Sequence, residues 1–336
     1  MPDVYRVVAE HRAALLRGEE SARSAVARAY QEAIAAMLRD IERAAARTDA
    51  SGYELLRVLM SEMETAARHL ERVAGPMAGT IARAQSAAVI AASGDAESIV
   101  RFLATAGDTP YRIWHDPEAA QNIVGALSDG SPLESALRER LAGKGLFGPS
   151  VLSQAKDALT TAVLRGVGAK EAARTLRPVL RSGQWVAERI VRTETIRAYR
   201  EASRQSYLEN ADVVSGWRWV ATHSARTCAA CLGMDGRVFP STVPFGSHPA
   251  CRCVSVPVVI GAEHLTTDRP TGEQWLHQQD ADTQEEILGA KGRAMWASGS
   301  VSLSDFVHES YSPQWGVTRT ARTPKERTAP ALNLAA

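Results

Sequence analysis

The N-terminal part of the chain places apolar residues at the intervals of three and four that an amphipathic helix requires. One such series would form a continuous helix face: Val26, Tyr30, Ala33, Met37 and Ile41. Side chains three and four apart lie on the same side of a helix, so this series is typical of a helix that packs along one face. We therefore predict that residues 1–142 form a helical N-terminal domain.

A second helix is expected after a break at residues 49–52. Ser51 is a suitable N-cap, and Glu54 three residues later would complete a capping box. The apolar positions that follow have the spacing of a coiled-coil seam: Leu56, Leu59, Met63, Ala66, Leu70 and Val73. Gly75 and Pro76 are expected to end the helix, because proline lacks the amide hydrogen that a helix interior uses. The seam predicts packing on a neighbouring helix, and self-association through this N-terminal arm is a further expectation.

Glycines and a proline in residues 142–149 predict a linker to a second domain. Three helical segments are expected beyond it: 152–164, 169–180 and 185–207. Alternating and β-branched residues then predict three short strands: 216–222, 237–239 and 254–260. Two further helices and a polar tail are expected at the end of the chain: 273–288, 303–311 and 318–336.

These elements predict an α+β fold that is predominantly α-helical. It would have a long N-terminal helical arm, a central helical domain with a small Cys/His-stapled β-rich lobe, a short helical C-terminal segment and a polar tail. The expected domains are residues 1–142, 150–262 and 263–336.

Composition narrows the class of protein without defining its activity. The formal net charge is +1, which argues against a protein that coats nucleic acid with a globally basic surface. No apolar run approaches the ~20 residues needed to cross a bilayer. The first residues also lack the basic and apolar regions of an export signal. We therefore expect a soluble protein with no membrane partner.

The four cysteines of the chain are concentrated in one short stretch, as a C-x-x-C pair followed by H-x-x-C-x-C. Five residues are candidate metal ligands: Cys228, Cys231, His248, Cys251 and Cys253. Structural zinc sites take four Cys and His ligands in a tetrahedron, usually from two such short motifs. Cys228, Cys231 and Cys251 are the favoured ligands, and either His248 or Cys253 would complete the set. Because a small lobe buries little core, a structural Zn²⁺ would supply stability.

Redox, disulfide and hydrolytic zinc chemistry each fit the same residues less well than a structural metal. A redox C-x-x-C usually opens a helix in a βαβ unit, and no such pattern surrounds Cys228. Disulfides suit an oxidising compartment, which no export signal supports. A hydrolytic zinc of the deaminase type needs H-x-E, but Ser224 and Ala225 follow His223. A structural metal is favoured over packed reduced thiols, disulfides or redox chemistry.

An ordered set of motifs runs through the second half of the chain: RTE at 192–194, WVAT at 219–222, RTCAAC at 226–231, DGRVF at 235–239 and HPACRC at 248–253. Their order resembles the phage Mu protein F-like head morphogenesis (minor capsid) proteins over residues 150–262. Many members of that family have Ser at the position of Cys228, so a complete metal site is expected of this particular chain.

The resemblance implies a structural part of a phage or prophage head without enzymatic activity. It implies a location in the virion, in the head interior near the portal, and in the host cytoplasm during assembly. The implied partners are the portal protein and the scaffold or major capsid protein. Contact with packaged DNA through its backbone is a further expectation.

Two other functions compete with this interpretation. A zinc-stapled DNA-binding protein that is not retained in the virion would use arginines of the lobe and basic residues of the tail: Arg218, Arg226, Arg237, Arg252, Arg319, Arg322, Lys325 and Arg327. An enzyme would combine a nucleophile with a base, but no spacing fixes the geometry of the candidates: His223, Asp235, Cys231 and His248. Trp217 and Trp219 are expected to pack in a core or interface rather than to stack on bases.

Overall fold

The computed structural model describes residues 4–109, 121–126, 130–135, 137, 151–312 and 316–322. In this part of the chain the protein is predominantly α-helical with small antiparallel sheets, which confirms the predicted fold class. The predicted linker over 142–149 and the tail beyond residue 322 lie outside the described residues. Among the described helices, none combines the length and the apolar character needed to span a bilayer.

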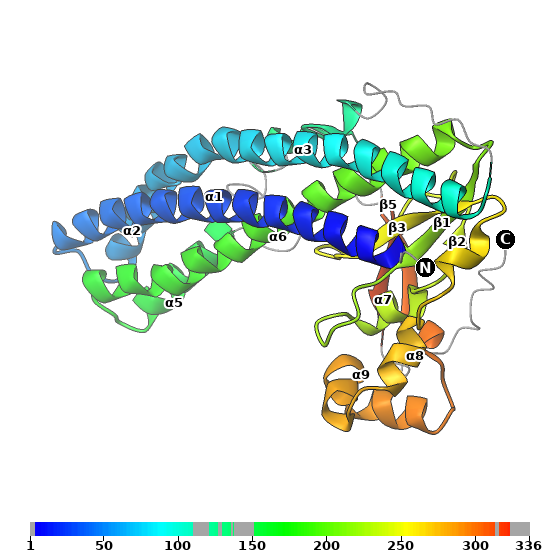
Figure 1. Ribbon diagram of the computed structural model, residues 1–336. Coiled ribbons are helices and arrows are strands. Elements are labelled where there is room, and N and C mark those ends of the chain that lie inside the picture. Colours follow the sequence, from blue (N-terminus) through cyan, green and yellow to red (C-terminus); the bar gives the residue numbers. More distant parts are fainter. Residues whose placement is uncertain are drawn as a thin grey trace. The chain divides into compact units, whose positions relative to one another are not determined.

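Long helices dominate the structure (Figure 1): α1 Val4–Ala46, α2 Gly52–Ala66, α3 Arg68–Ala106, α5 Val151–Leu164 and α6 Ala169–Glu209. The chain divides into two compact units. Unit 1 takes the described residues of three stretches: Met1–Leu16, Ala88–Gln121 and Ile196–Ala336. Unit 2 takes those of two: Arg17–Ala87 and Asn122–Thr195. Helices α1, α3 and α6 therefore contribute to both units. The predicted domain limits refer to consecutive sequence and stay a prediction.

Two prolines lie inside long helices rather than at their ends. α3 continues through Pro76 and α6 through Pro178. The predicted helix end at Gly75 and Pro76 is thus wrong, and so is the predicted break between residues 180 and 185. A proline in a helix interior costs roughly 3 kcal/mol. Burial of flanking side chains such as Met77 in the core offsets this cost, because tertiary packing supplies most of the stability of a helix.

The start of α2 differs in detail from the prediction. Ser51 is the N-cap, in extended conformation with φ −135° and ψ 167°, but its side chain makes no capping hydrogen bond. The predicted capping box with Glu54 is therefore wrong. Instead, the Leu55 amide donates to the Ser51 carbonyl oxygen at 3.4 Å, so the backbone alone closes the first turn.

The core of unit 2 is formed by one face of each of its helices. The predicted face of α1 is confirmed, since all five of its residues are buried: Val26, Tyr30, Ala33, Met37 and Ile41. The seam is confirmed at four positions: Leu59, Met63, Ala66 and Leu70. Leu55 rather than Leu56 is fully buried at its start. The Tyr30 hydroxyl donates to the Leu180 carbonyl oxygen at 2.8 Å, which joins α1 to α6 within this core.

Unit 1 contains a three-stranded antiparallel sheet of order β2–β1–β3. The strands coincide with the predicted ones: β1 Val214–Val220, β2 Val238–Phe239 and β3 Val254–Val259. Trp217 of β1 lies opposite Phe239 on one side and Pro257 on the other. Short helices follow the strands: α7 Ala229–Met234 after β1 and the 3₁₀ helix η2 Glu263–Thr266 after β3. A second 3₁₀ helix, η1 Gln121–Ile123, precedes this region in sequence.

The C-terminal region departs most from the prediction. The helix expected over 273–288 is two helices, α8 Gly272–His277 and α9 Ala281–Ala297. The break follows from a capping residue, since the Asp280 carboxylate accepts from the Thr283 amide at 2.8 Å and starts a new helix.

A hairpin replaces the helix predicted over 303–311 and the first part of the predicted tail. The 3₁₀ helix η3, Leu303–Phe306, leads into β4 Val307–Ser312, which pairs with β5 Gly316–Ala321. Arg319 of β5 is buried, 2.9 Å from the Glu309 carboxylate, and it donates to the Gly246 carbonyl oxygen at 3.1 Å. The polar residues of this hairpin led to the prediction of a tail, because the contacts of Arg319 with Glu309 and Gly246 cannot be read from local sequence.

Three long helices of unit 1 share a partly buried polar contact. The Tyr199 hydroxyl of α6 donates to Asp95 Oδ2 of α3 at 2.8 Å, and His11 Nδ1 of α1 lies 3.4 Å from Asp95 Oδ1. Burial raises the pKa of Asp95, and the hydrogen bond from Tyr199 opposes that rise. The contact fixes the three helices to one another within unit 1.

Replacement of Leu59 tests the core of unit 2. Leu59 is fully buried, so Leu59→Ala is expected to lower the free energy of unfolding by about 2–5 kcal/mol, through lost burial and a residual cavity. Urea unfolding followed by circular dichroism measures the change. Tyr53→Ala is the control, because Tyr53 is 83% exposed and its loss should change stability by less than about 0.5 kcal/mol. Equal effects of the two substitutions would contradict this core.

Candidate metal centre

All five predicted ligands lie together in unit 1. Cys228 is the N-cap of α7, and Cys231 lies inside this short helix. The other three residues lie on the segment that leads into β3: His248, Cys251 and Cys253. All four cysteines are free thiols, so the disulfide alternative finds no support here.

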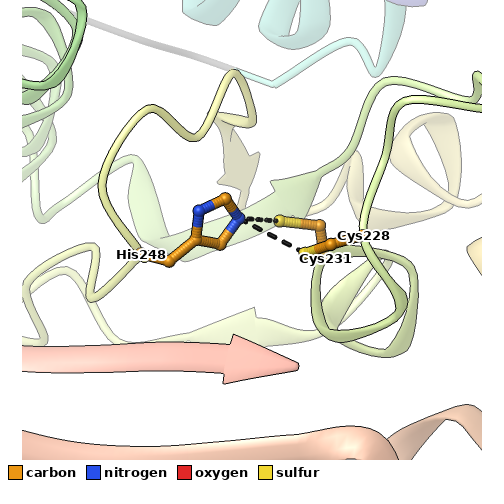
Figure 2. Close-up of side chains that lie close together, drawn as sticks. All are labelled: Cys228, Cys231 and His248. Atoms are coloured by element: carbon orange, nitrogen blue, oxygen red, sulfur yellow. Dashed lines mark hydrogen bonds between the residues drawn. The ribbon is translucent and has the colours of Figure 1, made fainter. Parts of the chain in front are cut away.

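The donor atoms of this cysteine cluster are separated by distances that suit a tetrahedral metal. His248 Nε2 lies 3.3 Å from Cys228 Sγ and 3.2 Å from Cys231 Sγ, and Figure 2 shows the imidazole edge turned toward both sulfurs. Cys231 Sγ is 3.6 Å from Cys251 Sγ. Zinc–ligand bonds of about 2.3 Å to sulfur and about 2.0–2.1 Å to nitrogen imply tetrahedral edges of roughly 3.8 Å and 3.6 Å. The cluster is thus close to the size that zinc requires.

The orientation of His248 also fits a ligand. Its Nδ1 lies 2.8 Å from the Pro249 carbonyl oxygen. A carbonyl oxygen can only accept, so Nδ1 carries a proton and donates it. The other nitrogen, Nε2, faces the two sulfurs. Metal-binding histidines usually have this arrangement, in which a hydrogen bond at one nitrogen orients the other toward the metal.

The thiols of the cluster differ in acidity. The hydrogen bond from Cys231 lowers the pKa of Cys228 to about 5, although burial opposes this shift. Burial raises the pKa of Cys253 well above its usual value. Burial alone would lower the pKa of His248, but contacts with Cys228 and Cys251 outweigh it and raise the pKa to about 11. At neutral pH, Cys228 and His248 thus form a thiolate–imidazolium pair, whose Nε2 proton a metal ion would displace.

The five candidates form two overlapping triples whose ligand atoms lie within 4.8 Å of one another: Cys228 with Cys231 and His248, and Cys231 with Cys251 and Cys253. Cys231 belongs to both triples and therefore occupies the middle of the cluster. The sequence favoured Cys228, Cys231 and Cys251, completed by His248 or Cys253. The structure brings all five together, and the choice of four stays a prediction.

Sequence reasoning missed the residue that holds the cluster in place. Arg200 of α6 is buried, and its guanidinium donates to the Cys253 carbonyl oxygen at 2.8 and 2.6 Å and to the Cys251 carbonyl oxygen at 3.1 Å. It also donates to Ser247 Oγ at 2.6 Å. One buried cation therefore binds the backbone of the segment that carries three of the five candidate ligands.

A signal for Arg200 exists in the sequence. Arg200 shares a buried helix face with three residues, which lie four positions before it and three and seven positions after it: Ile196, Ser203 and Tyr207. An arginine in the middle of such a face must find acceptors from another part of the chain, because unpaired charge is costly to bury. The identity of those acceptors depends on tertiary structure and could not be read from the spacing.

Aromatic rings fill the lobe beside this arginine. Phe245 stacks on Trp219 with ring centroids 4.0 Å apart, and Trp217 stacks on Phe239 at 4.6 Å. The Arg200 guanidinium lies 4.3 Å above the Phe245 ring. Trp217 and Trp219 are both 1% exposed, which confirms the prediction that they pack in a core.

Residues considered for an enzyme separate into two places. His223 Nε2 lies 2.8 Å from Asp235 Oδ2. His248 and Cys231 belong to the cysteine cluster, where their contact is 3.2 Å. The four residues that an enzyme would have to combine are therefore divided between a His–Asp pair and the candidate metal centre.

The region that contains Arg200 and the cysteine cluster is also the region that resembles known proteins. Residues 153–256 match the family described as Phage Mu protein F like protein. This span includes all of α6 with Arg200, and all five candidate ligands, and it ends inside β3. It confirms the family resemblance that the order of motifs predicted.

One similar curated protein is the Mu-like prophage FluMu F protein of Haemophilus influenzae. It is 26% identical over 168 aligned residues, which cover 41% of this chain and 41% of the relative. The match thus spans about two fifths of the length of that relative. No solved structure matches this chain.

Replacement of Arg200 tests the anchoring contact. Arg200→Met keeps an apolar stem but leaves the Cys251 and Cys253 carbonyl oxygens without this donor, and it should lower the free energy of unfolding by about 3 kcal/mol or more. Arg200→Lys keeps the charge and loses the forked geometry, so an intermediate loss is expected. Urea unfolding monitored by tryptophan fluorescence measures both changes. Wild-type stability of both variants would show that the contact is dispensable.

Proposed function

We propose that this protein is a phage or prophage head morphogenesis protein, a minor capsid protein that acts as a structural part of the virion near the portal. The match of residues 153–256 to Mu protein F-like proteins carries the proposal, because that family implies a role in head morphogenesis. The protein would lie in the head interior near the portal, and in the host cytoplasm during assembly. Its role would be structural rather than enzymatic.

The helices of unit 2 offer a surface for partner proteins. Lys156 near the start of α5 lies 2.8 Å from Glu64 near the end of α2, so the two helices are antiparallel. Tyr53 at the start of α2 and Leu164 at the end of α5 therefore lie at the same end of the pair, and they are 83% and 80% exposed. Contiguous exposed apolar patches mark protein-binding surfaces, and two such side chains at one end of a helix pair would contribute to a patch of this kind. We assign this end to the portal, scaffold or major capsid protein, or to a second copy.

A structural zinc ion would make the lobe a rigid docking module. The spacing of the donor atoms, the orientation of His248 and the low pKa of Cys228 support this assignment. Zinc bound by α7 and by the segment before β3 would join two parts of the lobe that are separated in sequence.

The alternative is a zinc-stapled DNA-binding protein that is not retained in the virion. The arginines expected to contact DNA are not equivalent: Arg226 is exposed, whereas Arg319 is buried beside Glu309. Contact with DNA phosphates would be a secondary property of a head protein, whereas in the alternative it would be the main function. Such binding would weaken steeply as salt concentration rises.

Metal content tests the zinc proposal. Purified wild-type protein should hold one zinc ion per chain by inductively coupled plasma mass spectrometry, and Cys231→Ser and His248→Asn should lose most of it. His223→Asn is the matched control, since His223 lies outside the cysteine cluster and its variant should keep the zinc. A chelator should lower the unfolding temperature of the wild type but not of Cys231→Ser. If the wild-type protein holds no zinc and a chelator does not change its unfolding temperature, the zinc proposal is wrong and the cluster consists of packed, reduced thiols.

Quantitative mass spectrometry of purified heads tests the role in the virion. The protein should be present at a few to a few tens of copies per head, with major capsid peptides as the internal standard. The double variant Tyr53→Ser with Leu164→Ser should reduce this number severalfold, because it removes the proposed docking surface.

Ile90→Ser is the control for that substitution, because Ile90 is 72% exposed but lies in unit 1. Absence of the wild-type protein from heads, with abundant protein in the lysate and salt-sensitive binding to duplex DNA, would favour the alternative function. If the wild type, the double variant and Ile90→Ser are incorporated into heads equally, Tyr53 and Leu164 do not form the docking surface.

A further inference from the structure

A second polar cluster lies in unit 1, outside the cysteine cluster and centred on Asp235. Asp235 Oδ1 accepts from the Ala221 amide at 2.7 Å, and Asp235 Oδ2 lies 2.8 Å from His223 Nε2 and 3.3 Å from Arg269 Nη2. The same Arg269 nitrogen is 2.6 Å from His223 Nε2. The Asp235 side chain is 3% exposed, whereas those of His223 and Arg269 are 16% and 20% exposed. The Asp235 carboxylate is therefore buried, whereas the side chains of His223 and Arg269 are partly accessible to solvent.

The first helix brings another arginine to this cluster. The Tyr5 hydroxyl donates to the Thr266 carbonyl oxygen, and the Arg269 guanidinium lies 5.1 Å from the Tyr5 ring. Arg12 is seven residues further along α1, about two turns, and so it lies on the same helix face. Burial and the charge of Arg269 lower the pKa of Arg12, while Cys253 and Asp235 favour its charged form. Arg12 is therefore within electrostatic range of both clusters.

Arg12 has a polar atom that the protein leaves unsatisfied. Its Nη1 is buried and has no hydrogen-bond partner within the described part of the chain, and no ion pair joins Arg12 to a carboxylate there. A buried donor without a partner costs free energy, more so when it carries charge. A donor of this kind calls for an acceptor.

The local charges do not balance. Arg269 already offsets Asp235, since the two lie 3.3 Å apart. Arg218 lies near the same residues, and it donates to two neutral acceptors: the Gly236 carbonyl oxygen and the Thr266 hydroxyl. Arg200 donates to the Cys251 and Cys253 carbonyl groups, which are neutral as well. Within the described part of the chain no ion pair joins Arg12 or Arg218 to a carboxylate, so the Asp235 cluster carries these two positive charges in excess.

We propose that Arg12 and Arg269, with His223 and Arg218 beside them, bind a phosphate group. Guanidinium groups match the oxygens of phosphate, and a tetrahedral oxyanion can accept from two arginines at once. A phosphate dianion would neutralise both excess charges, whereas a carboxylate or the phosphodiester of a DNA backbone, each a monoanion, would neutralise one of them. Trp275 stacks on His223 with ring centroids 5.4 Å apart and holds that imidazole in position. The phosphate is either free inorganic phosphate or part of a DNA backbone.

Thermal unfolding in phosphate and in chloride at equal ionic strength tests this site. Wild-type protein should unfold at a higher temperature in phosphate, because the folded state alone binds the anion. Arg12→Met, which keeps the apolar stem, should lose this difference and should be no less stable than the wild type in chloride. Calorimetric titration with inorganic phosphate should show an affinity at least about tenfold weaker for the variant.

Arg6→Met is the matched control on the same helix, since the Arg6 side chain is 75% exposed and its variant should respond to phosphate as the wild type does. The site is refuted if phosphate gives the wild type no advantage over chloride, or if both variants lose the response equally. Lower stability of Arg12→Met in both buffers, with the phosphate response intact, would assign Arg12 a packing role and also refute it.

Duplex DNA distinguishes the two sources of phosphate. Weaker DNA binding by Arg12→Met than by Arg6→Met would identify the backbone phosphodiester as the ligand. Unchanged DNA binding with a lost response to inorganic phosphate would identify the free anion. The measurement on purified heads is independent of both results, so failure of this site and failure of the head-assembly role can be told apart.

Discussion

The lobe of unit 1 depends on one buried charge, the guanidinium of Arg200. A buried arginine is tolerated only when its N–H groups find acceptors. The acceptors of Arg200 are the carbonyl groups of Cys251 and Cys253 and the Ser247 hydroxyl, and its guanidinium also lies over the Phe245 ring. The carbonyl groups belong to the residues whose thiols form the cluster, so the charge that fixes the backbone also positions the sulfurs. Helix α6 and the thiol-bearing segment thus form one structural unit, in keeping with a family match that contains both.

The same contacts relate the anchor to the chemistry of the thiols. Burial disfavours a thiolate at Cys251, but the hydrogen bond from Cys231 and the charge of Arg200 outweigh burial and place the pKa of Cys251 well below its usual value. Burial instead keeps Cys253 protonated. Two neighbouring thiols on one strand-like segment therefore differ in charge because of their surroundings rather than their type. A metal ion would find thiolates at Cys228 and Cys251 and would have to displace a proton from His248.

Local patterns in the sequence were enough to predict the strands, the buried face of α1 and the composition of the cysteine cluster. Each of these features depends on the spacing of residues that are close in sequence. Side-chain periodicity and the ligand geometry of metals can be read directly from that spacing. Several errors arose where distant residues decide the outcome. Pro76 stays in a helix because of core packing, and Arg319 of β5 is held by an ion pair with Glu309 and a hydrogen bond to the Gly246 carbonyl oxygen. The role of Arg200 was not predicted for the same reason, since its acceptors lie about fifty residues away.

Buried polar groups also account for how alanine-rich helices hold a single register in unit 1. Alanine side chains give smooth helix surfaces that pack almost equally well after a shift of one turn, so apolar contacts alone define the register weakly. Each of the three long helices contributes a polar residue whose partner lies on another helix: His11 on α1, Asp95 on α3 and Tyr199 on α6. A shift of α3 or α6 would leave the partly buried Asp95 carboxylate without its donor Tyr199, and a shift of α1 would separate it from His11. Arg200 imposes the same constraint on the segment before β3. The charged residues of unit 1 therefore specify its arrangement, while the apolar residues supply most of its stability.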